Sequence, residues 1–170
     1  MAFAPASLIL ANNYLPLNEA LCVFMIDRAS RNRLAELIRS LSSGQISNDE
    51  FEDSIPESND DAIRQVFSHG AWCLYSDMKE YKLKGKDALS RDDRTIVARW
   101  VLFLKTDIEY IWPSATFKED FLKCISLGIF GQSTLDKWKV HGNVELWPFS
   151  NIEQFNKAKK ENGYLGVQYT

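Results

Sequence analysis

The chain has 170 residues, of which 45% are hydrophobic and 25% charged, the profile of one globular domain that needs no disulfide or metal for stability. Its formal net charge of −3 lacks the basic excess that a general nucleic-acid binder carries. We therefore expect a single domain and no nucleic-acid partner.

Residues 1–24 are apolar but match neither a signal peptide nor a membrane span. No basic residue opens this segment, and Asn12, Pro16 and Glu19 interrupt its apolar run. An uninterrupted apolar stretch of about 18 residues, which a membrane span needs, is missing. Met25 then opens a helical pattern and is an alternative translation start to Met1. We predict an N-terminal extension over residues 1–24, one helical domain over residues 25–170, and a cytoplasmic protein without a membrane partner.

The first expected helix has apolar residues three and four apart and stops at Gly44, a residue typical of helix C-termini. Six Ser or Thr residues along the chain are followed three residues later by an acid, the spacing of a capping box at a helix N-terminus. These pairs are Ser47/Glu50, Ser58/Asp61, Ser90/Asp93, Thr116/Glu119, Ser133/Asp136 and Ser150/Glu153. Together they predict an all-α protein with a single compact multi-helix domain.

A run of acids separates the first helix from the next. Residues 49–61 carry seven acids and no base, and a basic stretch from Lys79 to Arg94 follows. Such a run is most often a solvated surface, but it also suits a docking face that attracts a basic protein, with Ile55 and Pro56 giving apolar contact. The predicted partner-binding residues are Asp49, Glu50, Phe51, Glu52, Asp53, Glu57, Asp60 and Asp61.

Two long amphipathic helices are expected from the apolar spacing. The first runs from Ser58 to Tyr81, and Gly70 within it would let a neighbouring element approach closely. The second runs from Ser90 to Ile108. Shorter helices are expected near residues 47–53, 116–128, 133–140 and 150–161.

The segments IEYIWP (residues 108–113) and VELWPF (residues 144–149) each place a glutamate before a Trp-Pro pair. Proline disfavours the helical conformation in the residue before it, so both tryptophans should be extended. We interpret the segments as buried corners, with each indole N–H bonded to a carbonyl or to the nearby glutamate; a binding site is the alternative. They are also the best candidates for a minor two-stranded β fringe. The residues of these corners, or of such a site, are Asp77, Asp107, Glu109, Trp112, Glu145 and Trp147.

No catalytic signature is found in the chain. Its two histidines, His69 and His141, belong to no Ser-His-Asp order, and the zinc-peptidase, P-loop and Rossmann motifs are missing. Asp77, Asp107 and Glu109 lie among apolar and aromatic neighbours, where converging carboxylates could bind Mg²⁺. A small metal-dependent hydrolase or nuclease-like enzyme is therefore the alternative function. Structural acids are the commoner case, so we predict no metal, no cofactor and no enzyme activity.

The blocks SGQISNDEFED, WCLYSD, RWVLFLKTDIEYIWP and VELWPF, in that order, resemble a widespread group of uncharacterised bacterial proteins. The resemblance covers roughly residues 25–155 and implies no activity or catalytic residue. Small acidic helical bacterial proteins of this kind are similar to immunity proteins, which bind and neutralise a cognate toxin. The expected function is a non-enzymatic binding protein of this type, with a basic toxin domain as partner. A regulatory subunit docked through the N-terminal extension is a further possibility.

Overall fold

The computed structural model describes residues 26–113 and 139–162. These residues form helices joined by turns, without a strand among them, so the predicted all-α fold is confirmed for this part of the chain. The α-helices are α1 (Arg28–Ser42), α2 (Asn48–Glu52), α3 (Asp61–His69), α4 (Arg91–Leu104) and α7 (Ile152–Asn162). The 3-10 turns are η1 (Ala71–Leu74), η2 (Gly85–Asp87) and η3 (Val144–Leu146).

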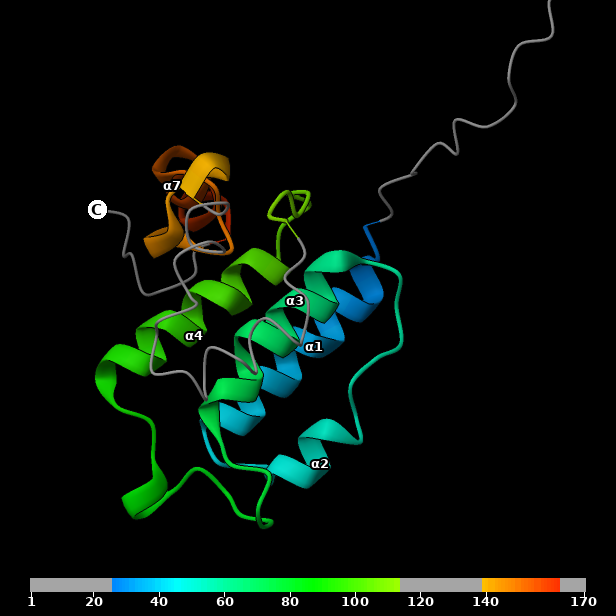
Figure 1. The fold of residues 1–170 in the computed structure, drawn as a ribbon, viewed down its shortest axis with the longest axis vertical. Coiled ribbons are helices and arrows are strands. Elements are labelled where there is room, and N and C mark those ends of the chain that lie inside the picture. Colours follow the sequence, from blue (N-terminus) through cyan, green and yellow to red (C-terminus); the bar gives the residue numbers. More distant parts are fainter. Residues whose placement is uncertain (1–25, 114–138, 163–170) are drawn as a thin grey trace, which may run out of the picture.

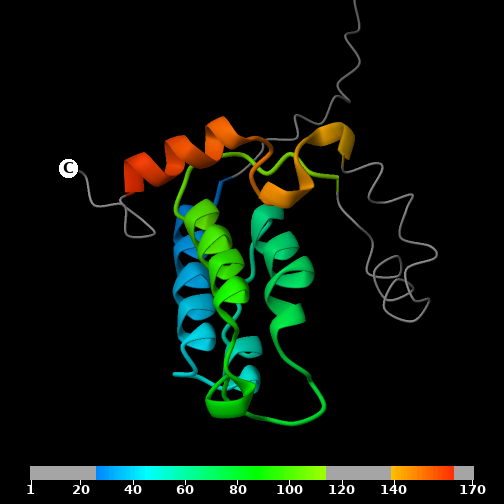
Figure 2. The same cartoon turned by 90° about the vertical axis from the view of Figure 1, so that its left-hand side faces the viewer.

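Helices α1, α3 and α4 lie side by side and pack against one another, with α4 running in the opposite direction to the other two (Figure 1). Helix α7 lies across the end of this bundle where α4 finishes, and α2 and η2 lie at the other end (Figure 2). No helix in the described ranges has both the length and the apolar character needed to cross a membrane.

Helix α1 ends where its sequence predicts, and the structure shows how its start is capped. Asp27 caps its N-terminus, because the carboxylate accepts a hydrogen bond from the backbone N–H of Ser30 at 3.0 Å. At the other end the N–H groups of Gly44 and Gln45 bond the carbonyls of Leu41 and Ser40, each at 2.8 Å. This is a Schellman ending, which requires a left-handed residue, and Gly44 has a φ of 66°.

Two of the expected capping boxes are confirmed. At α2 the Ser47 hydroxyl accepts from the N–H of Glu50 at 3.2 Å, and the Glu50 carboxylate accepts from the N–H of Ser47 at 2.8 Å. At α4 the same exchange joins Ser90 and Asp93 at 3.1 and 3.3 Å. Both N-termini therefore have backbone donors satisfied by local side chains.

The other boxes differ from the prediction or lie elsewhere. Ser58 does not begin α3, whose N-cap is Asp60. Before α7, the Asn151 side chain accepts from the N–H of Gln154 at 2.9 Å, and the Gln154 side chain accepts from the N–H of Ser150 at 3.2 Å. The capping unit is thus one residue later than the predicted Ser150/Glu153 pair. The boxes at Thr116/Glu119 and Ser133/Asp136 lie outside the described residues.

The helix expected from Ser58 to Tyr81 is wrong, because α3 ends at His69. Gly70 stops it where the Trp100 ring of α4 comes close: a Cβ at Gly70 would lie 3.2 Å from that ring and 2.6 Å from the carbonyl oxygen of Val66. The close approach of a neighbouring element to Gly70 is therefore found as predicted, but Gly70 lies at the end of the helix and not within it. Met78, which lies within the range of the expected helix, is 87% exposed.

Helix α4 ends at Leu104, four residues before the predicted end. Two arginines of α1 bind the carbonyls at and beyond this end. Arg28 donates to the carbonyls of Leu104 (2.7 Å) and Thr106, and Arg31 donates to those of Thr106 (3.2 Å) and Ile108 (2.7 Å). These side chains take the place of the backbone donors that a longer helix would supply.

The core lies between α1, α3 and α4, and α7 closes one end. Phe149 joins this end to α4 and α7, because its ring centroid lies 5.2 Å from that of Phe103 and 5.3 Å from that of Phe155. Contacts on both sides explain why successive residues of α4 are buried near its C-terminus. The fully buried apolar residues of the three helices include Leu34, Ala35, Ile38, Leu41, Ala62, Val66, Leu102, Phe103 and Leu104.

Candidate functional site

The two Trp-Pro segments contact each other. The indole N–H of Trp112 donates to the carbonyl of Pro148 at 2.8 Å, and that of Trp147 donates to the hydroxyl of Tyr110 at 3.1 Å. Trp112 is 3% exposed and Trp147 8%. Each segment therefore provides the hydrogen-bond acceptor for the tryptophan of the other, and both rings lie in the core as corners of the fold.

The glutamates of the two segments take no part in these bonds. Glu109 and Glu145 are both exposed, and η3 holds Glu145 where a strand was the alternative. Within the described residues neither segment is a strand, so the β fringe expected there is wrong for residues 108–113 and 144–149. The repeated Glu-Trp-Pro pattern is therefore not a repeated carboxylate site.

The structure does not bring Asp77, Asp107 and Glu109 together. Asp107 follows α4 and forms an ion pair with Arg28 at 2.8 Å. Asp77 lies in a loop bound to α2, because the Asn48 amide donates to carbonyls on both sides of it, those of Ser76 (3.4 Å) and Lys79 (3.1 Å). α2 and the end of α4 are at opposite ends of the bundle (Figure 2). In the described ranges no three His, Cys, Asp or Glu side chains are placed to hold a metal ion.

We expect Mg²⁺ or Mn²⁺ to leave the melting temperature of the metal-free protein unchanged. A specific site at 100 times its Kd would raise the free energy of unfolding by about 2.7 kcal/mol through mass action. Thermal melts with and without each metal provide the measurement. A saturable rise that disappears in Asp107→Asn would contradict the expectation and favour the metal-dependent alternative.

Five of the seven acids in the segment are exposed and Glu52 is half-buried, but two predicted docking residues, Phe51 and Asp60, are buried. Phe51 is 0% exposed and packs its ring against Phe67 and Tyr75, with centroid distances of 6.2 and 6.0 Å. Asp60 is 5% exposed and pairs with Arg31 of α1 at 2.5 Å. Placing Phe51 and Asp60 on a docking face was therefore wrong: one is a core ring and the other a buried ionic cap.

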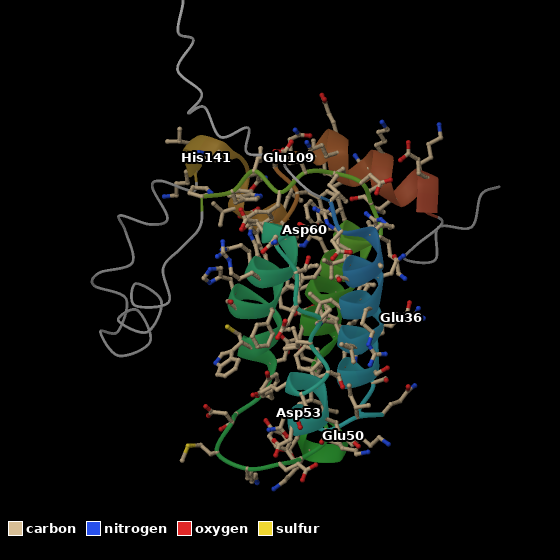
Figure 3. All side chains as sticks on the ribbon, turned by 90° about the vertical axis from the view of Figure 1, so that its right-hand side faces the viewer. Glu36, Glu50, Asp53, Asp60, Glu109 and His141 are labelled. Atoms are coloured by element: carbon tan, nitrogen blue, oxygen red, sulfur yellow. The ribbon has the colours of Figure 1, made fainter. Side chains whose placement is uncertain are left out.

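The remaining acids of the segment lie at the surface, exposed except for the half-buried Glu52, and we call this group the acidic face. Its members are Asp49, Glu50, Glu52, Asp53, Glu57 and Asp61. Figure 3 shows Glu50 and Asp53 close together at the end of the bundle that holds α2, and Asp60 toward the other end. Glu50 pairs with Lys82 at 3.7 Å, and Asp61 pairs with Arg64 at 2.5 Å.

Four members of the acidic face make no ion pair with any described residue. They are Asp49, Glu52, Asp53 and Glu57. Lys82, from the basic stretch, folds back onto the face and offsets the charge of Glu50. The N–H of Ser47 and, after it, the Lys82 ammonium lower the pKa of Glu50 below its ordinary value. The uncompensated negative charge is thus at residues 49 and 52–57.

Two hollows lie on either side of the acidic segment. The acidic hollow, of about 460 Å³, is lined by Glu36, Glu50 and Asp53 together with Arg33 and Leu37. The apolar hollow, of about 540 Å³, is lined by Ile55, Pro56, Ile63 and Phe67 together with Glu57 and Arg64. Ser54 lines the first hollow and its neighbour Ile55 the second, so the same stretch of chain separates them.

Two further residues, Glu36 and Tyr75, lie beside the acidic face and were not predicted from the sequence. Glu36 reaches the acidic hollow from α1, which the local acid run does not include. Tyr75 packs on Phe51, with 6.0 Å between the ring centroids. Burial raises the pKa of Tyr75, and the negative charge of Glu52 raises it further. The fold brings both residues to the face, and no local spacing in the sequence indicates this.

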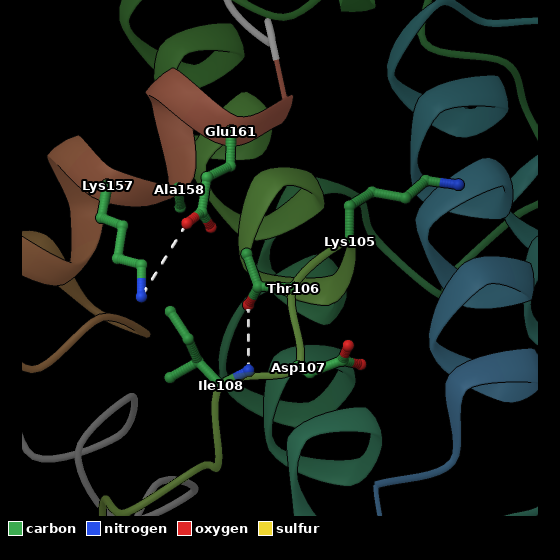
Figure 4. Close-up of a pocket in the computed structure, with 7 residues that line it drawn as sticks. All are labelled: Lys105, Thr106, Asp107, Ile108, Lys157, Ala158 and Glu161. Carbon is green, nitrogen blue, oxygen red and sulfur yellow. Dashed lines mark hydrogen bonds and ion pairs between the residues drawn. The ribbon is translucent and has the colours of Figure 1, made fainter.

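A third hollow lies between the segment after α4 and helix α7, and Figure 4 shows its lining. It has a volume of about 350 Å³. Its charged residues already have partners in the protein. The pairs are Lys105–Glu36 at 2.9 Å, Asp107–Arg28 at 2.8 Å and Lys157–Glu161 at 3.8 Å. Because these charges are paired, this hollow is a weaker candidate than the acidic face.

The acidic face and its two hollows are therefore the candidate site. Its chemistry suits binding, since it joins uncompensated carboxylates to apolar surface. The likeness of the sequence blocks to a bacterial protein group stays a prediction. Comparison of the chain with protein-family models, with curated proteins and with solved structures gave no match.

Proposed function

We propose that this protein is a non-enzymatic binding protein whose acidic face receives a basic protein partner, most concretely an immunity-type protein that neutralises a toxin domain. The observation that carries the proposal is the set of four carboxylates without an ion pair in the described chain, at Asp49, Glu52, Asp53 and Glu57. An acid paired within its own chain has its charge offset, whereas these four are available to a partner's lysines or arginines.

Charges at the edge of an interface act mainly on association. They orient and attract an oppositely charged partner before contact, and salt screens this attraction. Apolar contacts in the hollows would then slow dissociation. An effect of the acids on the association rate distinguishes a docking face from a merely solvated surface, because a solvated surface has no effect on a partner's association rate.

Neutralising the four unpaired acids is expected to slow association at low salt about tenfold or more and to flatten its dependence on ionic strength. The variant combines Asp49→Asn, Glu52→Gln, Asp53→Asn and Glu57→Gln. A partner is first isolated by affinity capture and identified, and association and dissociation rates are then measured by surface plasmon resonance across a salt series. For an immunity protein, that partner alone also arrests growth, and co-expression of the wild-type chain restores it.

A matched control changes the net charge equally but away from the face. It combines Glu109→Gln, Glu145→Gln, Glu153→Gln and Glu161→Gln, all at exposed positions. If the control slows association as much as the face variant, net charge alone explains the effect. Equal association rates and salt slopes in all three proteins would remove the docking proposal.

A further inference from the structure

The apolar hollow has the size and lining of a pocket for one large side chain. Its volume of about 540 Å³ is bounded by Ile55 and Pro56 on one side and by Ile63 and Phe67 of α3 on the other. Ile63 is 3% exposed, so this wall belongs to the core. Interfaces commonly bury an aromatic or arginine anchor in such a pocket, with near-neutral contacts around it.

The wall formed by the acidic segment is held in place. The Ser58 hydroxyl donates to the Asp27 carboxylate at 2.9 Å and accepts from the N–H of Asp60 at 3.2 Å. Asp60 is itself fixed by Arg31. A pocket formed before the partner arrives costs less ordering entropy on binding than one that must be assembled.

The edge of the hollow is negative. Arg64 is the one base among the residues that line it, and it is paired with Asp61 at 2.5 Å. Glu57 lines the hollow without an ion pair to a described residue, and Asp53 lines the acidic hollow on the other side of the same segment. A partner's anchor would therefore be flanked by uncompensated carboxylates.

Beyond Phe67 the negative surface continues over aromatic rings. The Phe67 ring contacts Trp72 at 5.6 Å, and Trp72 contacts Tyr75 at 6.0 Å between centroids. Burial raises the pKa of the Tyr75 hydroxyl, and the nearby Glu52 carboxylate raises it further. A guanidinium suits this position, because it stacks on aromatic faces and donates several hydrogen bonds.

From this arrangement we infer that the partner's binding segment carries one large apolar anchor flanked by arginine or lysine, and that the anchor enters the apolar hollow. The inference rests on the proposed function and names the chemistry of its partner. Two other occupants fit the charge less well. Residues 1–24 contain no lysine or arginine, and a second copy that docked face to face would bring an equally acidic surface.

The test measures binding of a fluorescent peptide, Gly-Arg-Arg-Trp-Arg-Arg-Gly, to the full chain by anisotropy at low salt. Two companion peptides replace the tryptophan with alanine or the four arginines with glutamine. We expect the tryptophan peptide to bind at least tenfold more tightly than the alanine peptide, and the glutamine peptide to bind most weakly of the three. The tryptophan increases the affinity because it buries apolar area in the hollow. The arginines increase it because they pair with the uncompensated acids, so the glutamine peptide loses affinity.

Two protein variants locate the anchor. Asn59→Trp places a ring at an exposed position in the hollow, and Gln45→Trp adds the same ring at an exposed position outside its lining. Asn59→Trp should abolish the difference between the tryptophan and alanine peptides, whereas Gln45→Trp should leave it intact. Ile55→Lys is a second variant in the lining of the apolar hollow, and it should weaken binding of the tryptophan peptide at least tenfold. Circular dichroism checks that each variant is folded.

The inference is overturned if the tryptophan and alanine peptides bind equally, or if Asn59→Trp leaves their difference unchanged. It is also overturned if an unlabelled peptide of residues 1–24 displaces the tryptophan peptide. The same holds if sedimentation shows that the chain self-associates and that this self-association displaces the tryptophan peptide. If the tryptophan and alanine peptides bind equally, but binding still requires the arginines and the four acids, the proposed function stands and only the anchor is removed. Anchor binding that is insensitive to neutralising those acids would instead remove the acidic-face proposal.

Discussion

Arg31→Met is expected to lower the free energy of unfolding by about 3–5 kcal/mol, a large part of the roughly 5–15 kcal/mol available to a domain. Arg31 is 1% exposed and pairs with the Asp60 carboxylate through two contacts, of 2.5 and 3.0 Å. Methionine fills much of the same volume but leaves that carboxylate buried without a counter-charge. It also removes the donors to the carbonyls of Thr106 and Ile108.

Chemical denaturation of four proteins measures this effect: wild type, Arg31→Met, Asp60→Asn and the double variant. Asparagine keeps a side-chain oxygen to cap α3 but carries no charge. The double variant should therefore lose less stability than the sum of the two single variants, since no unpaired charge is left in the core. Arg33→Met, at an exposed position of the same helix, is the control and should cost less than about 0.5 kcal/mol. A similar loss in Arg31→Met and Arg33→Met would show that the buried pair does not stabilise the fold.

Trp112→Ala and Trp147→Ala are each expected to cost about 3–5 kcal/mol of stability. Both rings are buried, and the Trp147 ring also packs edge-on against Trp100 at a centroid distance of 6.0 Å. Each loss has two parts, the cavity left by the ring and the acceptor left without a donor. Thermal and denaturant melts of the two variants measure the total.

Phenylalanine at either position separates the two parts. Trp112→Phe keeps most of the ring and loses the bond to the Pro148 carbonyl, so it should cost about 1–3 kcal/mol from the missing hydrogen bond and the smaller ring. If Trp112→Ala or Trp147→Ala melts like the wild type but binds a partner more weakly, the corner interpretation fails and the binding alternative is favoured.

Exposed acids could not be told from buried ones by the sequence. Asp60 lies in the same acidic run as Glu57 and Asp61, yet Asp60 is in the core and the other two are at the surface. The difference comes from Arg31, 29 residues earlier in the chain, which the fold places beside Asp60. Likewise, Lys82 neutralises Glu50 only because the loop after α3 returns to α2.

The sequence by itself determined the features that depend on neighbouring residues: the all-α class, the ends of α1, and the capping boxes of α2 and α4. Their hydrogen bonds join groups at most five residues apart, so local residue types fix them. Tertiary structure alone decided where α3 stops, which acids keep an uncompensated charge, and how the two Trp-Pro segments meet. Those outcomes depend on partners 29 to 37 residues away, such as Arg31 with Asp60 and Tyr110 with Trp147. The spacing of residues along the chain does not predict which distant groups will contact each other, because those contacts depend on how the whole core packs.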